Sequence, residues 1–201
     1  MKNIFLNIHG FGSSGSNSKA AALTCAFPDH KLISPDLPAN PQESLSILDA
    51  IIKDTDNRPL IMQGSSMGGL YALVMHIRHN IPALLINPAL TPATLVGNRL
   101  GEVYEFSNGD QIVISDEHVA QFAEVEKEIA SGIAGNHIAR NKVMALIGEQ
   151  DELLDQEIMK GILRKAGAEI ISYDTDHRFT GFDEVVASDR KVRHFLLMNQ
   201  D

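Results

Sequence analysis

The chain has 201 residues, which is a suitable length for one folded domain, and we predict that residues 1–201 form a single unit. Its net charge of −9 at pH 7 and its lack of clustered Lys and Arg argue against a nucleic-acid partner, since phosphate binding depends on grouped cations. No apolar stretch approaches the ~20 residues that span a bilayer, and the first residues lack a signal-peptide pattern, so we expect a cytoplasmic protein without a membrane partner.

Six short apolar runs alternate with six segments of helical periodicity. We predict buried strands at residues 3–8, 31–34, 59–63, 83–87, 142–147 and 168–173. We predict helices at residues 18–27, 41–54, 67–80, 116–131, 151–166 and 183–198. This alternation indicates an α/β fold, with a mostly parallel sheet of about six strands and helices on both faces. The ligand crevice of such a sheet lies beyond the carboxyl ends of its strands.

The first helical segment carries Cys25, the one cysteine of the chain, so an internal disulfide is excluded. Its neighbours are small and apolar, and we predict that Cys25 lies on the inner face of that helix. The basic stretch at residues 190–194 has helical spacing and is predicted to be the solvated face of the last helix.

Gly64-Ser65-Ser66-Met67-Gly68 lies between a predicted strand and a predicted helix. This is the context required of the G-x-S-x-G nucleophile elbow, in which a tight turn presents the serine at the top of the sheet. Gly64 and Gly68 remove side chains that would clash with such a turn. We therefore predict that Ser66 is a nucleophile; an ordinary Gly/Ser turn is the alternative.

Residues 88–115 interrupt the alternation, because no clear crossover helix is present. Val103–Phe106 and Gln111–Ile114 instead flank Ser107-Asn108-Gly109-Asp110, which predicts a hairpin with Asn-Gly in its turn. An insertion at this place would lie over the crevice, so a lid or pocket wall is one interpretation. A structural excursion or an oligomer contact is the other.

A serine nucleophile needs a base and an orienting acid, expected after late strands in the order Ser, acid, His. Asp151 follows the fifth predicted strand and is our choice of acid, although it is also well placed as a helix N-cap. Glu149, Glu152 and Asp155 remain alternatives. His177 is the histidine that lies in a loop just beyond the last strand, and we predict that it is the general base.

The Gly/Ser-rich loop at residues 9–14 follows the first strand, where a hydrolase takes the second amide of its oxyanion hole. We predict the N–H groups of Phe11 and Met67 as the donors. Gly10 would let the backbone approach the substrate, and His9 would brace the loop. The loop lacks both phosphate-binding glycine patterns, and the chain has no His-x-x-x-His or His-Glu-x-x-His pair, so we expect neither a cofactor nor a metal.

Several segments together carry a family resemblance, which extends over nearly the whole chain. They are His9-Gly10-Phe11, Gly64-Ser65-Ser66-Met67-Gly68-Gly69, Asn87-Pro88-Ala89, Gly148-Glu149-Gln150-Asp151 and Asp176-His177-Arg178-Phe179-Thr180-Gly181-Phe182. The chain resembles the small bacterial YqiA/YcfP-like esterases of the α/β-hydrolase superfamily. The resemblance implies a compact α/β-hydrolase sheet without leading antiparallel strands, a Ser66-Asp151-His177 triad and activity on short acyl esters. Arg178 departs from the family pattern; it would favour a substrate carboxylate or pair with Asp174 or Asp176.

The predicted function is therefore hydrolysis of a small-molecule carboxylic ester through an acyl-enzyme. Thioester hydrolysis uses the same machinery and remains an alternative. A binding protein on a hydrolase fold is another, and the sequence leaves a homo-oligomer open.

Overall fold

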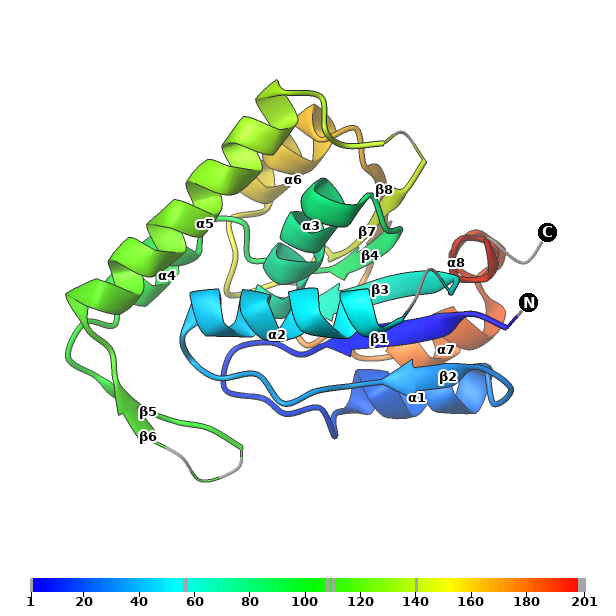
Figure 1. The fold of residues 1–201 in the computed structure, drawn as a ribbon, viewed down its shortest axis with the longest axis horizontal. Helices are drawn as coiled ribbons and strands as arrows, with labels where there is room; N and C mark the ends of the chain where they lie inside the picture. Colours follow the sequence, from blue (N-terminus) through cyan, green and yellow to red (C-terminus); the bar gives the residue numbers. More distant parts are fainter. Residues whose placement is uncertain (1, 56–57, 108, 110, 140, 199–201) are drawn as a thin grey trace.

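A six-stranded parallel sheet forms the centre of the protein (Figure 1). The computed structural model describes residues 2–55, 58–107, 109, 111–139 and 141–198. The strands, in their order across the sheet, are β2 (Lys31–Ile33), β1 (Ile4–Ile8), β3 (Leu60–Ser65), β4 (Ala83–Ile86), β7 (Val143–Gly148) and β8 (Glu169–Tyr173). The predicted parallel sheet of six strands is confirmed.

Helices cover both faces of the sheet because successive side chains of a strand point to opposite faces. In β1, Leu6 packs into the core beneath α2 (Pro41–Asp54), α3 (Met67–His79), α5 (Asp116–Ala134) and α6 (Gln156–Lys165). Phe5 packs on the opposite side, beneath α1 (Ser18–Ala26), α7 (Phe182–Ser188) and α8 (Arg190–Leu197). None of the helices in the described part of the chain is long and apolar enough to cross a membrane.

Two aspartates set helix boundaries that the sequence analysis misplaced. The helix predicted at residues 151–166 begins only at Gln156, because the Asp155 carboxylate accepts the Ile158 N–H and caps it. The last predicted helix, residues 183–198, is divided into α7 and α8 at Asp189. The Asp189 backbone is extended there, and its side chain accepts the N–H groups of Lys191 and Val192.

The prediction that Cys25 faces the core is wrong, because this cysteine is exposed. Helix α1 buries Ala22 and Leu23 against the sheet. The last turn of α1 lies closer to solvent, since Thr24 and Cys25 are both exposed and Ala26 is only partly buried.

The segment between β4 and α5 contains a short helix that the sequence analysis missed, α4 (Pro92–Gly97). It is followed by the predicted hairpin, formed by antiparallel strands β5 (Val103–Glu105) and β6 (Gln111–Val113). Asn108 of the predicted Asn-Gly turn lies outside the described residues. The hairpin projects from the body of the molecule near the start of α5 (Figure 1).

Candidate active site

Ser66 lies in the turn between β3 and α3, and its backbone adopts φ 54° and ψ −119°. A non-glycine residue pays a steric cost at such a positive φ, which persists only where its surroundings impose it. Here the Ser66 N–H donates to Ile86 O, and the Ser66 carbonyl accepts from the N–H groups of Gly69 and Ala89. The strained turn is therefore held by β4 and by the first turn of α3.

The glycines of the elbow are required by close backbone contacts. A Cβ on Gly64 would lie 2.1 Å from Gly68 O, and a Cβ on Gly68 would lie 2.0 Å from Ile8 O. Both distances are far below van der Waals contact, so any side chain would separate β1, β3 and α3. Gly10 is less tightly enclosed, with Ser65 O and Ser66 Cβ both 3.3 Å from its Cβ position.

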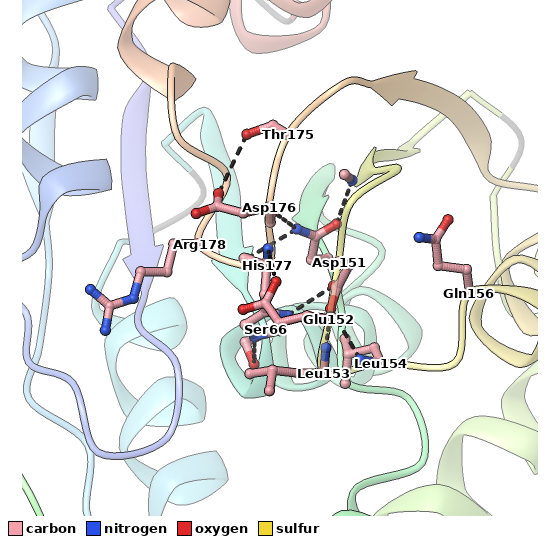
Figure 2. Close-up of polar contacts among 12 residues, drawn as sticks. Ser66, Asp151, Glu152, Leu153, Leu154, Gln156, Thr175, Asp176, His177 and Arg178 are labelled. Carbon is pink, nitrogen blue, oxygen red and sulfur yellow. Dashed lines mark hydrogen bonds and ion pairs between the residues drawn. The ribbon is translucent and has the colours of Figure 1, made fainter.

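The His177 imidazole lies between Ser66 and Asp151 (Figure 2). Its Nε2 is 3.1 Å from Ser66 Oγ, and its Nδ1 is 2.8 Å from Asp151 Oδ2. A carboxylate only accepts hydrogen bonds, so Nδ1 carries the hydrogen and Nε2 presents its lone pair to the serine hydroxyl. The structure thus brings together three residues that are far apart in the sequence, from the carboxyl ends of β3, β7 and β8.

The Asp151 side chain is fully buried, and a turn orients it. Its Oδ1 accepts the N–H groups of Leu153 and Leu154, at 2.9 and 3.0 Å. Its other oxygen is thereby directed at His177, whose side chain is 12% exposed. The two backbone donors therefore fix the orientation of the carboxylate towards the ring.

The alternative acids have other positions. Glu152 accepts the backbone N–H of His177 at 3.1 Å, and Asp155 caps α6. No hydrogen bond between Glu149 and the ring is present in the part of the chain that the structure describes. Among these candidates, Asp151 is thus the carboxylate hydrogen-bonded to the imidazole.

Asn87 joins the loops that carry Asp151 and His177, a role that the sequence analysis did not assign. Its Oδ1 accepts the Gly148 N–H at 2.7 Å, and its Nδ2 donates to the carbonyls of Asp176 and His177, both at 3.0 Å. The residue is fully buried and has φ 39°, a backbone region in which Asn is more common than other non-glycine residues. The sequence signal that could have indicated this role is an Asn directly after a buried strand and before a Pro.

The loop after β1 approaches the elbow from the other side. Within the described residues, the backbone N–H groups of Phe11 and Met67 have no acceptor, and both residues line the cavity above Ser66. His9 is buried; its Nε2 accepts the Leu37 N–H at 2.9 Å, and its Nδ1 lies 2.8 Å from Gly10 O. Both ring nitrogens of His9 are thus engaged in holding the loop against the chain that follows β2.

A cavity of about 750 Å³ opens above Ser66 and His177. Its walls come from the loop after β1, the elbow, α4 and the hairpin, with Leu95, Val96 and Tyr104 among the apolar contributors. The Phe11 ring stacks at a tilt against Tyr104, with centroids 5.0 Å apart, and Ser107 N–H donates to Gly12 O. The hairpin is therefore attached directly to the loop that carries the predicted oxyanion donor.

Arg178 forms no ion pair with Asp174 or Asp176 in the described structure. Gln150 donates to the Asp174 carboxylate, and Thr180 donates to Asp176 through its N–H and its hydroxyl. The Thr180 backbone N–H is the leading cause that lowers the pKa of Asp176, although this carboxyl is otherwise open to solvent. Arg178 instead lines the cavity.

A second buried histidine, His76, lies away from this site at the end of α3. Its Nδ1 donates to Ile81 O, and its Nε2 accepts the Ala139 N–H. Burial lowers the pKa of His76. No group of three or more His, Cys, Asp or Glu side chains suited to a metal ion occurs among residues 2–55, 58–107, 109, 111–139 and 141–198.

The parallel sheet, the strained serine elbow and the cavity at the strand ends define the α/β-hydrolase fold. The chain belongs to the family described as uncharacterised protein family UPF0227, whose model matches residues 4–194. This match confirms the resemblance to the YqiA/YcfP-like family.

Solved structures share the fold at low sequence identity. Est1E from Butyrivibrio proteoclasticus has a TM-score of 0.74 and 16% identity, covering 98% of this chain and 87% of Est1E. The monoacylglycerol lipase of Paleococcus ferrophilus has a TM-score of 0.62 and 17% identity, covering 92% of this chain and 93% of the lipase. A thioesterase domain from the curacin biosynthetic pathway has a TM-score of 0.62 and 12% identity, covering 93% of this chain and 92% of that domain.

Proposed function

We propose that this protein is a serine hydrolase that cleaves carboxylic esters with short acyl groups. The observation that carries the proposal is the His177 ring, which bridges the Ser66 hydroxyl and the buried Asp151 carboxylate. This arrangement turns a weakly nucleophilic hydroxyl into an effective nucleophile. The names of the structural neighbours, an esterase and a monoacylglycerol lipase among them, agree with this chemistry.

In the first half of the reaction, Ser66 Oγ attacks the ester carbonyl carbon while His177 Nε2 takes the hydroxyl proton. The negative charge that develops on the carbonyl oxygen is stabilised by the free N–H groups of Phe11 and Met67. Asp151 keeps the imidazole in its tautomer and stabilises the imidazolium. The tetrahedral intermediate then collapses, the ester C–O bond breaks, and His177 returns the proton to the departing alcohol.

In the second half, water attacks the carbonyl carbon of the acyl-enzyme, and His177 accepts a proton from that water. Collapse of this second intermediate breaks the bond to Ser66 Oγ, which recovers its proton from His177. The carboxylic acid leaves, and no cofactor takes part in the cycle.

Thioester hydrolysis is the alternative within the same reaction class, and a thioesterase domain is among the proteins that share the fold. An acyl-CoA and an oxygen ester with the same acyl chain distinguish the two activities. A higher kcat/KM on the oxygen ester supports the proposal, and a reversed order would make the protein a thioesterase.

Fluorophosphonate labelling followed by intact-protein mass spectrometry and peptide mapping tests the activated serine. We expect one adduct on Ser66, which is absent in Ser66→Ala and retained in the neighbouring control Ser65→Ala. Absence of an adduct on the folded wild-type protein would contradict the proposal and favour a binding protein whose crevice is closed to substrate.

A further inference from the structure

The charged side chains that line the cavity have one sign. In the described lining they are Lys19, Arg99 and Arg178. The imidazoles of His9 and His177 also line the cavity, and no Asp or Glu does. The chain as a whole has 26 acidic residues and 17 Lys and Arg. A cavity lined by cations within an acidic protein is therefore a local feature, opposite in sign to the net charge.

The carboxylates nearest the site do not neutralise these cations from inside the cavity. Asp151 is fully buried against His177, and Glu152 accepts the His177 backbone N–H. Asp176 accepts two hydrogen bonds from Thr180, and it interacts electrostatically with Lys19 from outside the lining. None of these three side chains lines the cavity.

Arg178 is the cation best placed to meet a ligand. Its guanidinium is exposed and has no hydrogen bond or ion pair with any residue that the structure describes. Figure 2 shows its side chain extending away from the Asp151–His177 pair, on the opposite side from Gln156. A group bound by this guanidinium would lie at some distance from the atom that Ser66 attacks.

Two further cations differ from Arg178 in their partners. Lys19 donates to the backbone carbonyl of Arg178, which holds the start of α1 beside the His177 loop. Arg99 has an exposed partner, Glu102, at 3.4 Å in the turn that follows α4, and such surface pairs contribute little. Lys19 thus lies next to Arg178, and its charge is partly offset by the nearby carboxylates of Asp176 and Asp183. The charge of Arg99 is partly offset by Glu102.

We infer that the substrate of this hydrolase carries an anionic group, a carboxylate or a phosphate, that Arg178 binds at a distance from the scissile carbonyl. A guanidinium suits either anion because its N–H donors match two oxygens at once. This inference rests on the proposed function and names the substrate class of the same site. It assigns to Arg178 the specificity for a charged ester over a neutral one.

The test compares esters that differ in charge. On the acyl side, p-nitrophenyl hemiglutarate is compared with p-nitrophenyl pentanoate, after subtraction of spontaneous hydrolysis. On the alcohol side, 4-butyryloxybenzoate is compared with its methyl ester. For a leaving group that carries phosphates, butyryl-CoA is compared with the uncharged thioester S-butyryl-N-acetylcysteamine. The quantity measured is the ratio of kcat/KM for the anionic ester to kcat/KM for the neutral one, in wild type, Arg178→Gln and Arg164→Gln.

We expect a ratio above one for at least one pair in wild type, and the pair identifies where the anion lies. Arg178→Gln should lower that ratio about tenfold, the loss expected for a hydrogen-bonded charge. Arg164→Gln removes the same charge from an exposed position on α6 and should leave the ratio unchanged. A ratio that Arg178→Gln does not change, or that Arg164→Gln lowers equally, would overturn the inference.

Failure of the inference is distinguishable from failure of the proposed function. If wild type hydrolyses the neutral esters and Ser66→Ala does not, the hydrolase stands whatever the charge ratio. If neither neutral nor anionic esters are hydrolysed, the proposed function fails and the inference falls with it.

Discussion

Two members of the triad, Ser66 and His177, line the same cavity as the hairpin, but the triad and the hairpin are built differently. The triad residues follow three strands of the central sheet, and Asn87 hydrogen-bonds the loops of two of them together. In the described part of the chain, the hairpin strands form a separate two-stranded sheet, and the Val103 and Val113 side chains are 63% and 58% exposed. Its aromatic contacts with Phe11 connect it to the rest of the site.

This difference indicates a division of labour. Reacting groups must be held within a few tenths of an ångström, which buried strand ends with satisfied hydrogen bonds achieve. A wall that selects substrates tolerates more movement and more sequence change. We therefore expect substitutions near the sheet to remove activity or stability, and substitutions in the hairpin to change substrate preference.

The largest effect is expected at Ser66. Ser66→Ala should lower kcat/KM for a short acyl ester by at least ~10³-fold, because it removes the nucleophile. Its unfolding midpoint should remain close to that of wild type, since the hydroxyl hydrogen-bonds to one side chain, His177, among the described residues. His177→Ala should lose activity to a similar extent, and the double variant should be little worse than either one. A loss much smaller than 10³-fold at both positions would contradict the triad.

Substitution of Asn87 tests the connection between the two loops. Asn87→Ala leaves a buried N–H and two carbonyls without their partner and should lower the free energy of unfolding by roughly 2–4 kcal/mol. Activity should fall with it, because Asp151 and His177 lose their common support. Urea unfolding and kcat on the same preparation measure both effects.

Asn87→Asp is the matched control, since it keeps the acceptor for Gly148 N–H and loses the donors to Asp176 and His177. We expect a destabilised protein in which kcat falls by a larger factor than KM rises. Unchanged stability and activity in both variants would show that the loops are held by other contacts.

Tyr104 tests the hairpin side of the comparison. Tyr104→Ala removes ring contacts with Phe11 and Phe106, each worth about 1 kcal/mol. KM should rise several-fold and the order of preference among acyl chain lengths should change, while the Ser66 adduct with fluorophosphonate still forms. Tyr104→Phe keeps the ring and should behave like wild type. Equal loss of kcat in both variants would contradict a packing role.

The smallest effect concerns His76, which is remote from the cavity. Burial lowers its pKa below the unfolded value of about 6.5, so the unfolded chain binds the proton more readily. The stability that His76 contributes is present above about pH 6.5 and is lost as the pH falls from there towards the folded pKa. Urea unfolding at pH 7.5 and 5.5 should show a smaller loss for His76→Gln than for wild type. Equal losses would assign the pH dependence to other groups.

The sequence by itself determined the sheet and the placement of the site along the chain. Buried parallel strands are continuous apolar runs, and the strand-turn-helix context of Ser66 is local, so both are readable without contacts. The motifs also identified the family. The predictions were wrong where a helix boundary depended on one capping side chain, as at Asp155 and Asp189. The burial of Cys25 was also predicted wrongly, because it depends on which side of a short helix meets the sheet.

The tertiary structure decided what depends on residues distant in sequence. The strand order brings Ser66, Asp151 and His177 close together. The turn at Leu153 and Leu154 orients Asp151, rather than Glu152, towards the His177 ring. The roles of Asn87 and the unpaired position of Arg178 also depend on such contacts. Hydrogen bonds act over about 3 Å, and only the folded chain brings these groups within that distance.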